Sequence, residues 1–99
     1  MKNTHTITRE VYNFFAERIS AKMVGKHYLS EVFKYDDGEV VHRLELSLMI
    51  YREAGSGELI DIGDVWWDCT TIEFDEDGEP VLKINDFDYK ELYRIIMGL

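Results

Sequence analysis

The sequence predicts an α+β domain in which an N-terminal helix, an antiparallel meander of about four strands and a C-terminal helix follow one another. Apolar residues recur at helical spacing near both ends and alternate with polar residues in the middle, and glycine-containing turns separate the alternating segments. The 99 residues include one proline and no internal repeat, so we expect a single domain over residues 1–99. Both helices should cover one face of the sheet.

The first helix is predicted over residues 8–24. Its apolar residues recur at helical spacing: Val11, Tyr12, Phe15, Ile19 and Met23. Thr8 fits the N-cap, with Ile7 and Tyr12 placed as a hydrophobic staple. Gly25 suits the left-handed position that often follows a helix. Signals at both ends therefore define this helix.

Two antiparallel strands are predicted next, over His27–Tyr35 and Glu39–Arg52. Asp37-Gly38 between them is typical of a two-residue type I′ hairpin turn, which needs positive φ. In the second strand the even-numbered residues form the predicted core face: Val40, His42, Leu44, Leu46, Leu48 and Ile50.

The run Gly55–Glu58 predicts another reversal, followed by strands over Leu59–Ile62 and Val65–Phe74. Gly63 interrupts this stretch and is a candidate β-bulge. The alternation of apolar residues also changes phase along this stretch: Val65, Trp67 and Cys69 are at odd positions, whereas Ile72 and Phe74 are at even positions. We expect a bulge or bend to cause the change of phase.

A third hairpin and a second helix complete the chain. Asp77-Gly78 predicts the turn, and a short final strand should follow from Pro80 to Ile84. For the helix, Asp88 is the expected N-cap and Glu91 closes a capping box. The staple pairs Phe87 with Leu92, and the buried stripe should comprise Leu92, Ile95, Ile96 and Leu99.

The formal net charge of −9 is concentrated in the second half of the chain. Residues 1–52 carry eight Lys or Arg and seven Asp or Glu, whereas residues 53–99 carry three basic and thirteen acidic side chains. Such a field repels phosphate backbones and anionic membranes, which argues against direct nucleic-acid binding and membrane binding. This negative charge is explained either by its contribution to solubility alone or by association with a basic protein surface.

The single cysteine, Cys69, excludes an internal disulfide, and no stretch has the roughly 20 consecutive apolar residues of a spanning helix. The first residues also lack the apolar core of a signal peptide. We therefore expect a soluble cytoplasmic protein in a reducing compartment.

An acidic run in the second half partly resembles a calcium-binding loop, because Glu73, Asp75, Asp77 and Gly78 match its positions 1, 3, 5 and 6. Position 12 is Ile84 instead of a bidentate carboxylate, so the run predicts an acidic hairpin without a metal. The sequence contains no zinc-ligand spacing and no phosphate-binding glycine pattern. No cofactor is expected.

Trp66 and Trp67 are adjacent in a predicted strand, so their side chains must point to opposite faces of the sheet. One should enter the helix-covered core, and the other should lie on the open face beside Met49 and Tyr51. Exposed aromatic residues are enriched in binding hot spots. The open-face tryptophan therefore indicates a partner or self-association surface, with a second small core under a loop as the alternative.

His42 lies on the apolar phase of its strand, where we expect a core histidine held by a hydrogen bond. A nucleophilic dyad with Cys69 would require neighbouring strands to align the two side chains. Asp61, Asp64 and Asp68 surround the tryptophans and are candidates for acid–base or cation chemistry, although solvated loop charges are the simpler interpretation. The sequence predicts no catalytic residue.

The leading hypothesis is an interaction protein that binds a basic partner, as inhibitors, immunity proteins and nucleic-acid mimics do. The predicted contact residues are Met49, Tyr51, Asp61, Asp64, Trp66, Trp67, Asp68, Asp75, Glu76, Asp77 and Glu79. One alternative is a small-molecule-binding domain or modest enzyme, whose pocket between sheet and helices contains His42 and Asp68. Another is a structural homodimer formed through the open sheet face.

Overall fold

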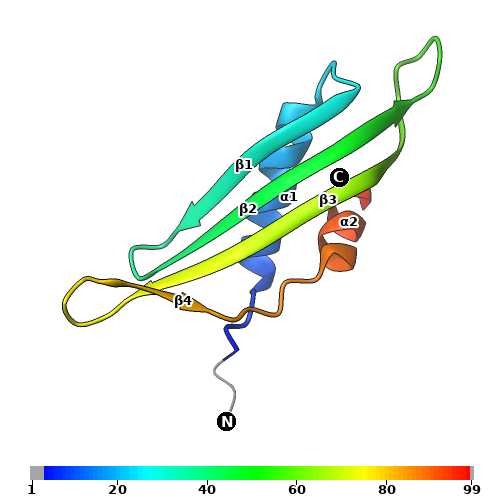
Figure 1. Cartoon of the computed structure of the whole chain (residues 1–99). Helices are drawn as coiled ribbons and strands as arrows, with labels where there is room; N and C mark the ends of the chain where they lie inside the picture. Colours follow the sequence, from blue (N-terminus) through cyan, green and yellow to red (C-terminus); the bar gives the residue numbers. More distant parts are fainter. Residues whose placement is uncertain (1–3, 99) are drawn as a thin grey trace.

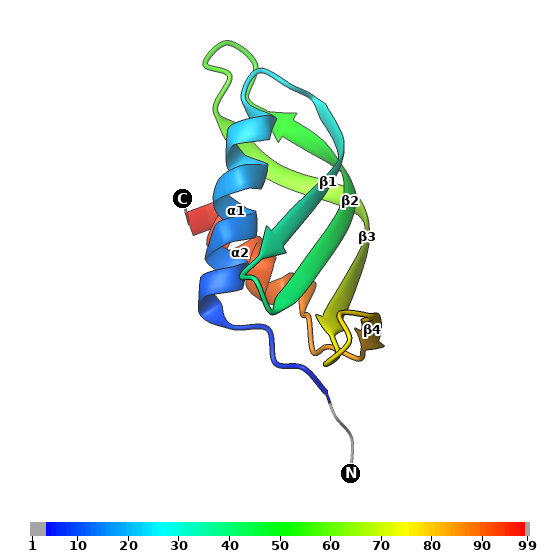
Figure 2. The ribbon, with the colours of Figure 1, turned by 90° about the vertical axis from the view of Figure 1, so that its left-hand side faces the viewer.

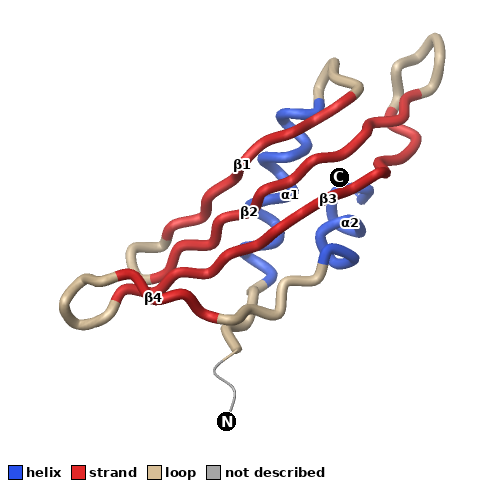
Figure 3. Tube along the Cα trace, viewed as in Figure 1, coloured by secondary structure: helices blue, strands red, loops and turns tan. Residues whose placement is uncertain are grey.

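The computed structural model describes residues 4–98, which form two helices and one four-stranded antiparallel sheet (Figure 1). The elements are α1 (Arg9–Met23), β1 (Tyr28–Asp36), β2 (Val40–Arg52), β3 (Leu59–Phe74), β4 (Pro80–Lys83) and α2 (Tyr89–Gly98). The strand order β1-β2-β3-β4 follows the chain, so the sheet is a meander (Figure 3). Both helices lie on the same side of it (Figure 2). The predicted fold class is confirmed.

The domain is elongated, with extents of 55 × 23 × 20 Å. The long strands β2 and β3 set this length, and the short β4 pairs only with Thr71–Phe74 at the end of β3. The edge of β3 before that segment has no strand beside it in the described chain. In that chain, no helix is long and apolar enough to span a membrane.

The signals at the ends of α1 act as predicted. Thr8 is the N-cap, and its hydroxyl accepts a hydrogen bond from the Val11 amide at 3.4 Å. Ile7 and Tyr12 are both buried, as expected for a hydrophobic staple. Gly25 has a φ of +72°, a conformation that a side chain disfavours, and it turns the chain from the helix into β1.

The core lies between the helices and the even-numbered face of β2. Leu44, Leu46 and Leu48 are completely or almost completely buried, and they belong to one cluster with Phe15 and Ile19 of α1. Burying each such side chain contributes about 1.5 to 3 kcal/mol. The alternation in this part of the sequence therefore identified the core face correctly.

The turn between β1 and β2 differs from the predicted type I′ turn at Asp37-Gly38. Asp36 pairs with Val41, and the Asp37 amide donates to the Val40 carbonyl at 3.2 Å, so the central residues are Gly38 and Glu39. Only Gly38 has a positive φ, +94°, which fits a type II′ turn with glycine first. Asp37 is the first residue of this turn, and its carboxylate accepts the amides of Glu39 and Val40.

The bulge predicted near Gly63 is present one residue later. Met49 pairs with Gly63 and Ser47 pairs with Trp66, so two residues of β3, Asp64 and Val65, lie opposite one residue of β2. Asp64 has a φ of +51°. A bulge of this kind re-aims the side chains that follow it.

The same bulge does not explain the later change of apolar phase, and that part of the prediction was wrong. The register from Trp66 to Glu73 is continuous with β2. Ile72 pairs with Val41 and therefore lies on the open face, and Phe74 shares that face. The phase of the apolar pattern changes because this regular part of β3 carries apolar residues on both of its faces.

The start of α2 is capped differently from the predicted capping box. The Asp88 carboxylate accepts the Lys90 amide at 3.0 Å, as an N-cap residue does. However, the Asp88 amide donates to the Tyr12 hydroxyl at 2.9 Å, and Glu91 pairs with Arg94 at 2.6 Å. A contact from α1 thus replaces the Glu91 contact of a capping box.

The buried stripe of α2 follows the prediction in the part that is described. Leu92 and Ile96 are buried, and Ile95 is half-buried against the core. Leu99 lies outside the described residues. Leu92, Ile95 and Ile96 pack α2 beside α1.

Candidate functional site

The sheet face that points away from the helices has no cover in the described chain (Figure 2). Its position follows from the register, since directly opposed residues share a face. The large hydrophobic side chains exposed on this face are Tyr28, Val32, Met49, Tyr51, Trp66, Phe74 and Leu82. Contiguous exposed apolar residues mark interaction sites on soluble domains.

Trp66 is the tryptophan on the open face, where 56% of its surface is exposed. Trp67 points to the helix side and packs against Phe87, with 4.9 Å between the ring centroids. Its remaining exposure of 38% shows that it lies at the margin of the core. Both tryptophans were predicted as contact residues, but only Trp66 lies on the open face.

Six of the predicted contact residues gather at one end of the open face, and we call this set the Trp66 surface: Met49, Tyr51, Asp61, Asp64, Trp66 and Asp68. Ser47 pairs with Trp66, Met49 pairs with Gly63 across the bulge, and Tyr51 pairs with Asp61 further along the same strands. A Cβ at Gly63 would approach the Tyr51 ring to 3.1 Å, so the ring lies directly over the glycine.

Hydrogen bonds hold two of the carboxylates of the Trp66 surface. The Tyr51 hydroxyl donates to Asp64 Oδ2 at 2.8 Å, and this contact raises the pKa of Tyr51. Asp61 Oδ1 accepts the Tyr93 hydroxyl of α2 at 2.6 Å and the Ile62 amide at 2.8 Å. Both donors lower the pKa of Asp61, so its charge persists at mildly acidic pH.

The carboxylates of the Trp66 surface have no basic partner among the described residues. The ion pairs there join His5 to Glu73, Lys22 to Glu31, Arg43 to Glu45 and Arg94 to Glu91. Asp61, Asp64 and Asp68 take part in none of them. An exposed tryptophan thus shares its end of the sheet with three carboxylates that have no basic partner in the described chain, an arrangement that attracts cationic groups.

The other predicted acidic contacts, Asp75, Glu76, Asp77 and Glu79, lie elsewhere. They form the β3–β4 loop at the end of the sheet opposite the β2–β3 loop (Figure 1). Asp75 Oδ1 accepts the amides of Asp77 and Glu79 and so shapes the turn. No group of three metal-ligating side chains is found in the described residues.

His42 is a buried histidine with 3% of its surface exposed, and its Nδ1 lies 2.9 Å from the Thr71 hydroxyl. Burial lowers its pKa, and the neighbouring His5 ring, 5.1 Å away, lowers it further. The expected hydrogen-bonded core histidine is confirmed. Asp68 pairs with Glu45 on the opposite face, so His42 and Asp68 do not line one pocket.

Cys69 does not form a nucleophilic dyad with His42. In the register His42 pairs with Thr71 and Cys69 pairs with Leu44, and the hydrogen-bond partner of His42 is the Thr71 hydroxyl. Burial raises the pKa of the Cys69 thiol to about 12. A thiol of this kind is protonated and unreactive at neutral pH.

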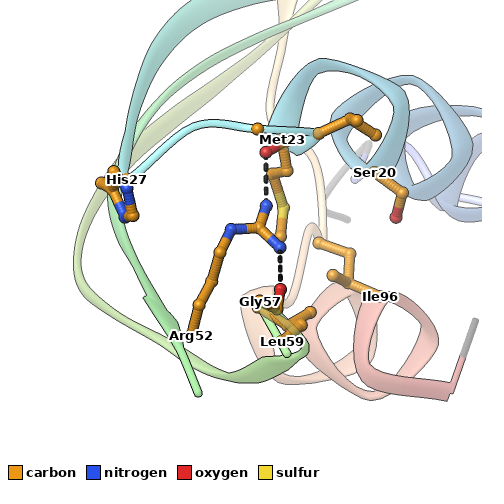
Figure 4. A pocket seen from close by; sticks show the side chains of 9 residues that line it. Ser20, Met23, His27, Arg52, Gly57, Leu59 and Ile96 are labelled. Carbon is orange, nitrogen blue, oxygen red and sulfur yellow. Dashed lines mark hydrogen bonds between the residues drawn. The ribbon is translucent and has the colours of Figure 1, made fainter. Parts of the chain in front are cut away.

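Figure 4 shows a cavity between the sheet and the helices, and His42 is not among the residues that line it. It has a volume of about 690 Å³ and is lined mainly by apolar side chains, including Met23, Leu59 and Ile96. The Arg52 guanidinium projects into it and donates to the carbonyls of Met23 at 2.6 Å and Gly57 at 3.1 Å. Sequence reasoning missed Arg52, which alternation alone marks only as the end of a strand.

Comparison of the chain with protein-family models, with curated proteins and with solved structures finds no match.

Proposed function

We propose that the protein is an interaction domain that binds a basic protein surface through the Trp66 surface. The observation that carries the proposal is the position of Trp66, which is more than half exposed at an end of the sheet that also carries three carboxylates without a basic partner among the described residues. Tryptophan is enriched among residues that dominate binding energy. Its ring face also attracts Lys and Arg side chains.

The charge of the whole chain supports the same partner chemistry. A net charge of −9 steers a basic protein toward the domain and increases the association rate. Inhibitors, immunity proteins and nucleic-acid mimics act through such complementarity. We expect the domain to act in the cytoplasm, where its free Cys69 stays reduced.

A homodimer through the open face is the less favourable use of the same surface. The described strands place five acidic side chains on this face against two basic ones: Asp36, Glu45, Asp61, Asp64 and Asp68 against Lys34 and Arg43. Two copies packed face to face would bring these like charges together, whereas a basic partner would neutralise them. Light scattering at low and high protein concentration distinguishes the two arrangements.

The cavity at Arg52 favours a second function, the binding of a small molecule between sheet and helices. Its apolar lining with a few polar groups is typical of ligand sites. Four elements and two loops meet there: the end of α1, α2, the end of β2 and the start of β3, with the α1–β1 loop and the β2–β3 loop. Screening by thermal shift with small amphipathic compounds tests this use, and a cavity-filling Leu59→Trp variant should abolish any shift.

The main proposal is tested by identifying a partner and then measuring direct binding. The tagged chain captures proteins at low salt, and the captured protein is identified, purified and titrated against the domain. Trp66→Ala should weaken this binding by about 10-fold or more. Thr70→Ala, on the same face beyond the Trp66 surface, is the matched control and should change little. Equal affinities of the two variants would contradict the proposal.

A further inference from the structure

A hollow interrupts the row of large side chains on the open face. Ser30 of β1 pairs with Ser47 of β2, and Ser47 pairs with Trp66 of β3, so two small residues lie in line with the tryptophan. The hydroxyl oxygens of Ser30 and Ser47 are 3.1 Å apart. The resulting hollow has a volume of about 390 Å³, with Val32 and Glu45 also lining it.

The walls of the hollow combine an aromatic face with negative charge. Trp66 forms the β3 side, and Glu45 lies one row further along the strands, directly opposite Asp68. Val32 pairs with Glu45 on the other side and supplies an apolar wall. The serine hydroxyls form a polar floor that can accept hydrogen bonds. Each of these features suits a cation with an apolar stem.

We infer that this hollow receives the side chain of an arginine from the basic partner. The inference rests on the proposed function and adds the group that the partner inserts. The planar guanidinium stacks on the Trp66 ring and donates to Glu45, Asp68 and the serine hydroxyls. Arginine fits better than lysine, because its flat group with five donors matches an aromatic wall and several acceptors, whereas an ammonium is compact and more strongly hydrated.

Arg43 acts as an internal competitor for the hollow. Its guanidinium pairs with Glu45 at 2.5 Å, so one carboxylate that would receive the incoming arginine is already partly neutralised. Asp68 keeps its negative charge free of a basic partner in the described chain. Replacing Arg43 with glutamine should therefore strengthen binding of an arginine side chain, by about two- to fivefold for an exposed pair.

The test uses the whole chain with Trp67→Phe, so that Trp66 is the only remaining tryptophan. Titration with N-acetyl-arginine methylamide should change its fluorescence saturably, with Kd on the order of millimolar. The citrulline analogue has nearly the same shape without the charge and should give no saturable change. Equal responses to the two compounds would overturn the inference.

Filling the hollow supplies the second arm of the experiment. Ser47→Leu should abolish the saturable response to the arginine compound, whereas Thr70→Leu, which adds the same side chain to the same face outside the hollow, should preserve it. Circular dichroism checks that each variant is folded, and Ser30→Leu replaces Ser47→Leu if the latter is not. An unchanged response in a folded, filled variant would overturn the inference.

The two proposals fail in different ways. If the purified basic partner binds Ser47→Leu as tightly as wild type but loses affinity with Trp66→Ala, the arginine hollow is wrong and the proposed function stands. If the hollow binds the arginine compound but Trp66→Ala leaves partner binding unchanged, the proposed function is wrong. Loss of partner affinity in both variants supports both proposals.

Discussion

The Tyr51 hydroxyl donates a hydrogen bond to the Asp64 carboxylate over 2.8 Å, across the bulge that separates two segments of β3. This contact holds an acidic side chain against an aromatic ring on the uncovered face of the sheet. The ring itself lies over Gly63, where any side chain would crowd it. The bulge therefore arranges the Trp66 surface and also bends the strand.

Replacing Asp64 with asparagine should lower the pKa of Tyr51. The charged acceptor stabilises the protonated phenol, so the hydrogen bond raises this pKa in the wild type. The change is measured by an NMR titration of the Tyr51 ring at alkaline pH, with the other tyrosines as internal references. An identical Tyr51 titration in both proteins would show that the contact does not form in solution.

The backbone at Asp64 gives a prediction about stability. Its φ of +51° disfavours a branched side chain, so Asp64→Val should destabilise the fold by about 1 to 2 kcal/mol. Asp64→Gly should cost less, because glycine adopts this conformation readily although it also loses the Tyr51 contact. Urea unfolding of the two variants gives the comparison. Equal stabilities would contradict the strained conformation.

Substitution of the two tryptophans one at a time should lower the stability at Trp67 and leave it nearly unchanged at Trp66. Trp67→Ala removes the packing on Phe87 and should cost about 1 to 2 kcal/mol of unfolding free energy. Trp66→Ala removes an exposed side chain and should change stability by less than about 0.5 kcal/mol. Denaturant unfolding followed by circular dichroism measures both. A larger stability loss for Trp66→Ala would place Trp66 in a packed environment and remove the open surface.

His42 should make the fold less stable at mildly acidic pH. Burial and the nearby His5 lower its pKa in the folded state, although Asp37 acts in the opposite direction. The unfolded chain therefore binds the proton more readily, and stability falls as the pH drops below about 6.5 toward the lowered folded pKa. Unfolding free energies at pH 7.5 and 5.5 should differ more in wild type than in His42→Gln. Parallel pH profiles would contradict this role.

Cys69 should resist modification while the protein is folded. With its pKa raised to about 12, the thiolate fraction at pH 8 is about a thousandfold or more below that of a free cysteine. A thiol-reactive disulfide should therefore label the native protein slowly and the urea-unfolded protein at once. Rapid labelling of the native state would show that the thiol is accessible and ionised.

The sequence predicted the fold because its local signals agree with one another. Thr8 and Gly25 delimit α1, and the alternation through Leu44, Leu46 and Leu48 identifies the buried face. The type of the β1–β2 turn and the Glu91 contact at the start of α2 differ from the prediction. Asp37 competes for backbone amides, and the Tyr12 hydroxyl reaches the Asp88 amide from the other end of the chain.

The candidate site was predicted only in part, because its geometry depends on strand register. Adjacent positions required Trp66 and Trp67 to diverge, but only the pairing of Ser47 with Trp66 assigns each to a face. The hollow between Ser30 and Ser47 joins residues from two strands whose alignment the sequence does not encode locally. Long-range pairing likewise separates His42 from Asp68, which sequence reasoning had put together.

The most direct measurement of the central claim is the affinity of the purified basic partner as a function of salt. In wild type the affinity should fall steeply with rising ionic strength, because exposed charges on the Trp66 surface attract the partner. The triple variant Asp61→Asn, Asp64→Asn, Asp68→Asn should bind more weakly at low salt and show a much flatter dependence. Affinities that do not change with ionic strength and are equal in the two proteins would contradict binding through this surface.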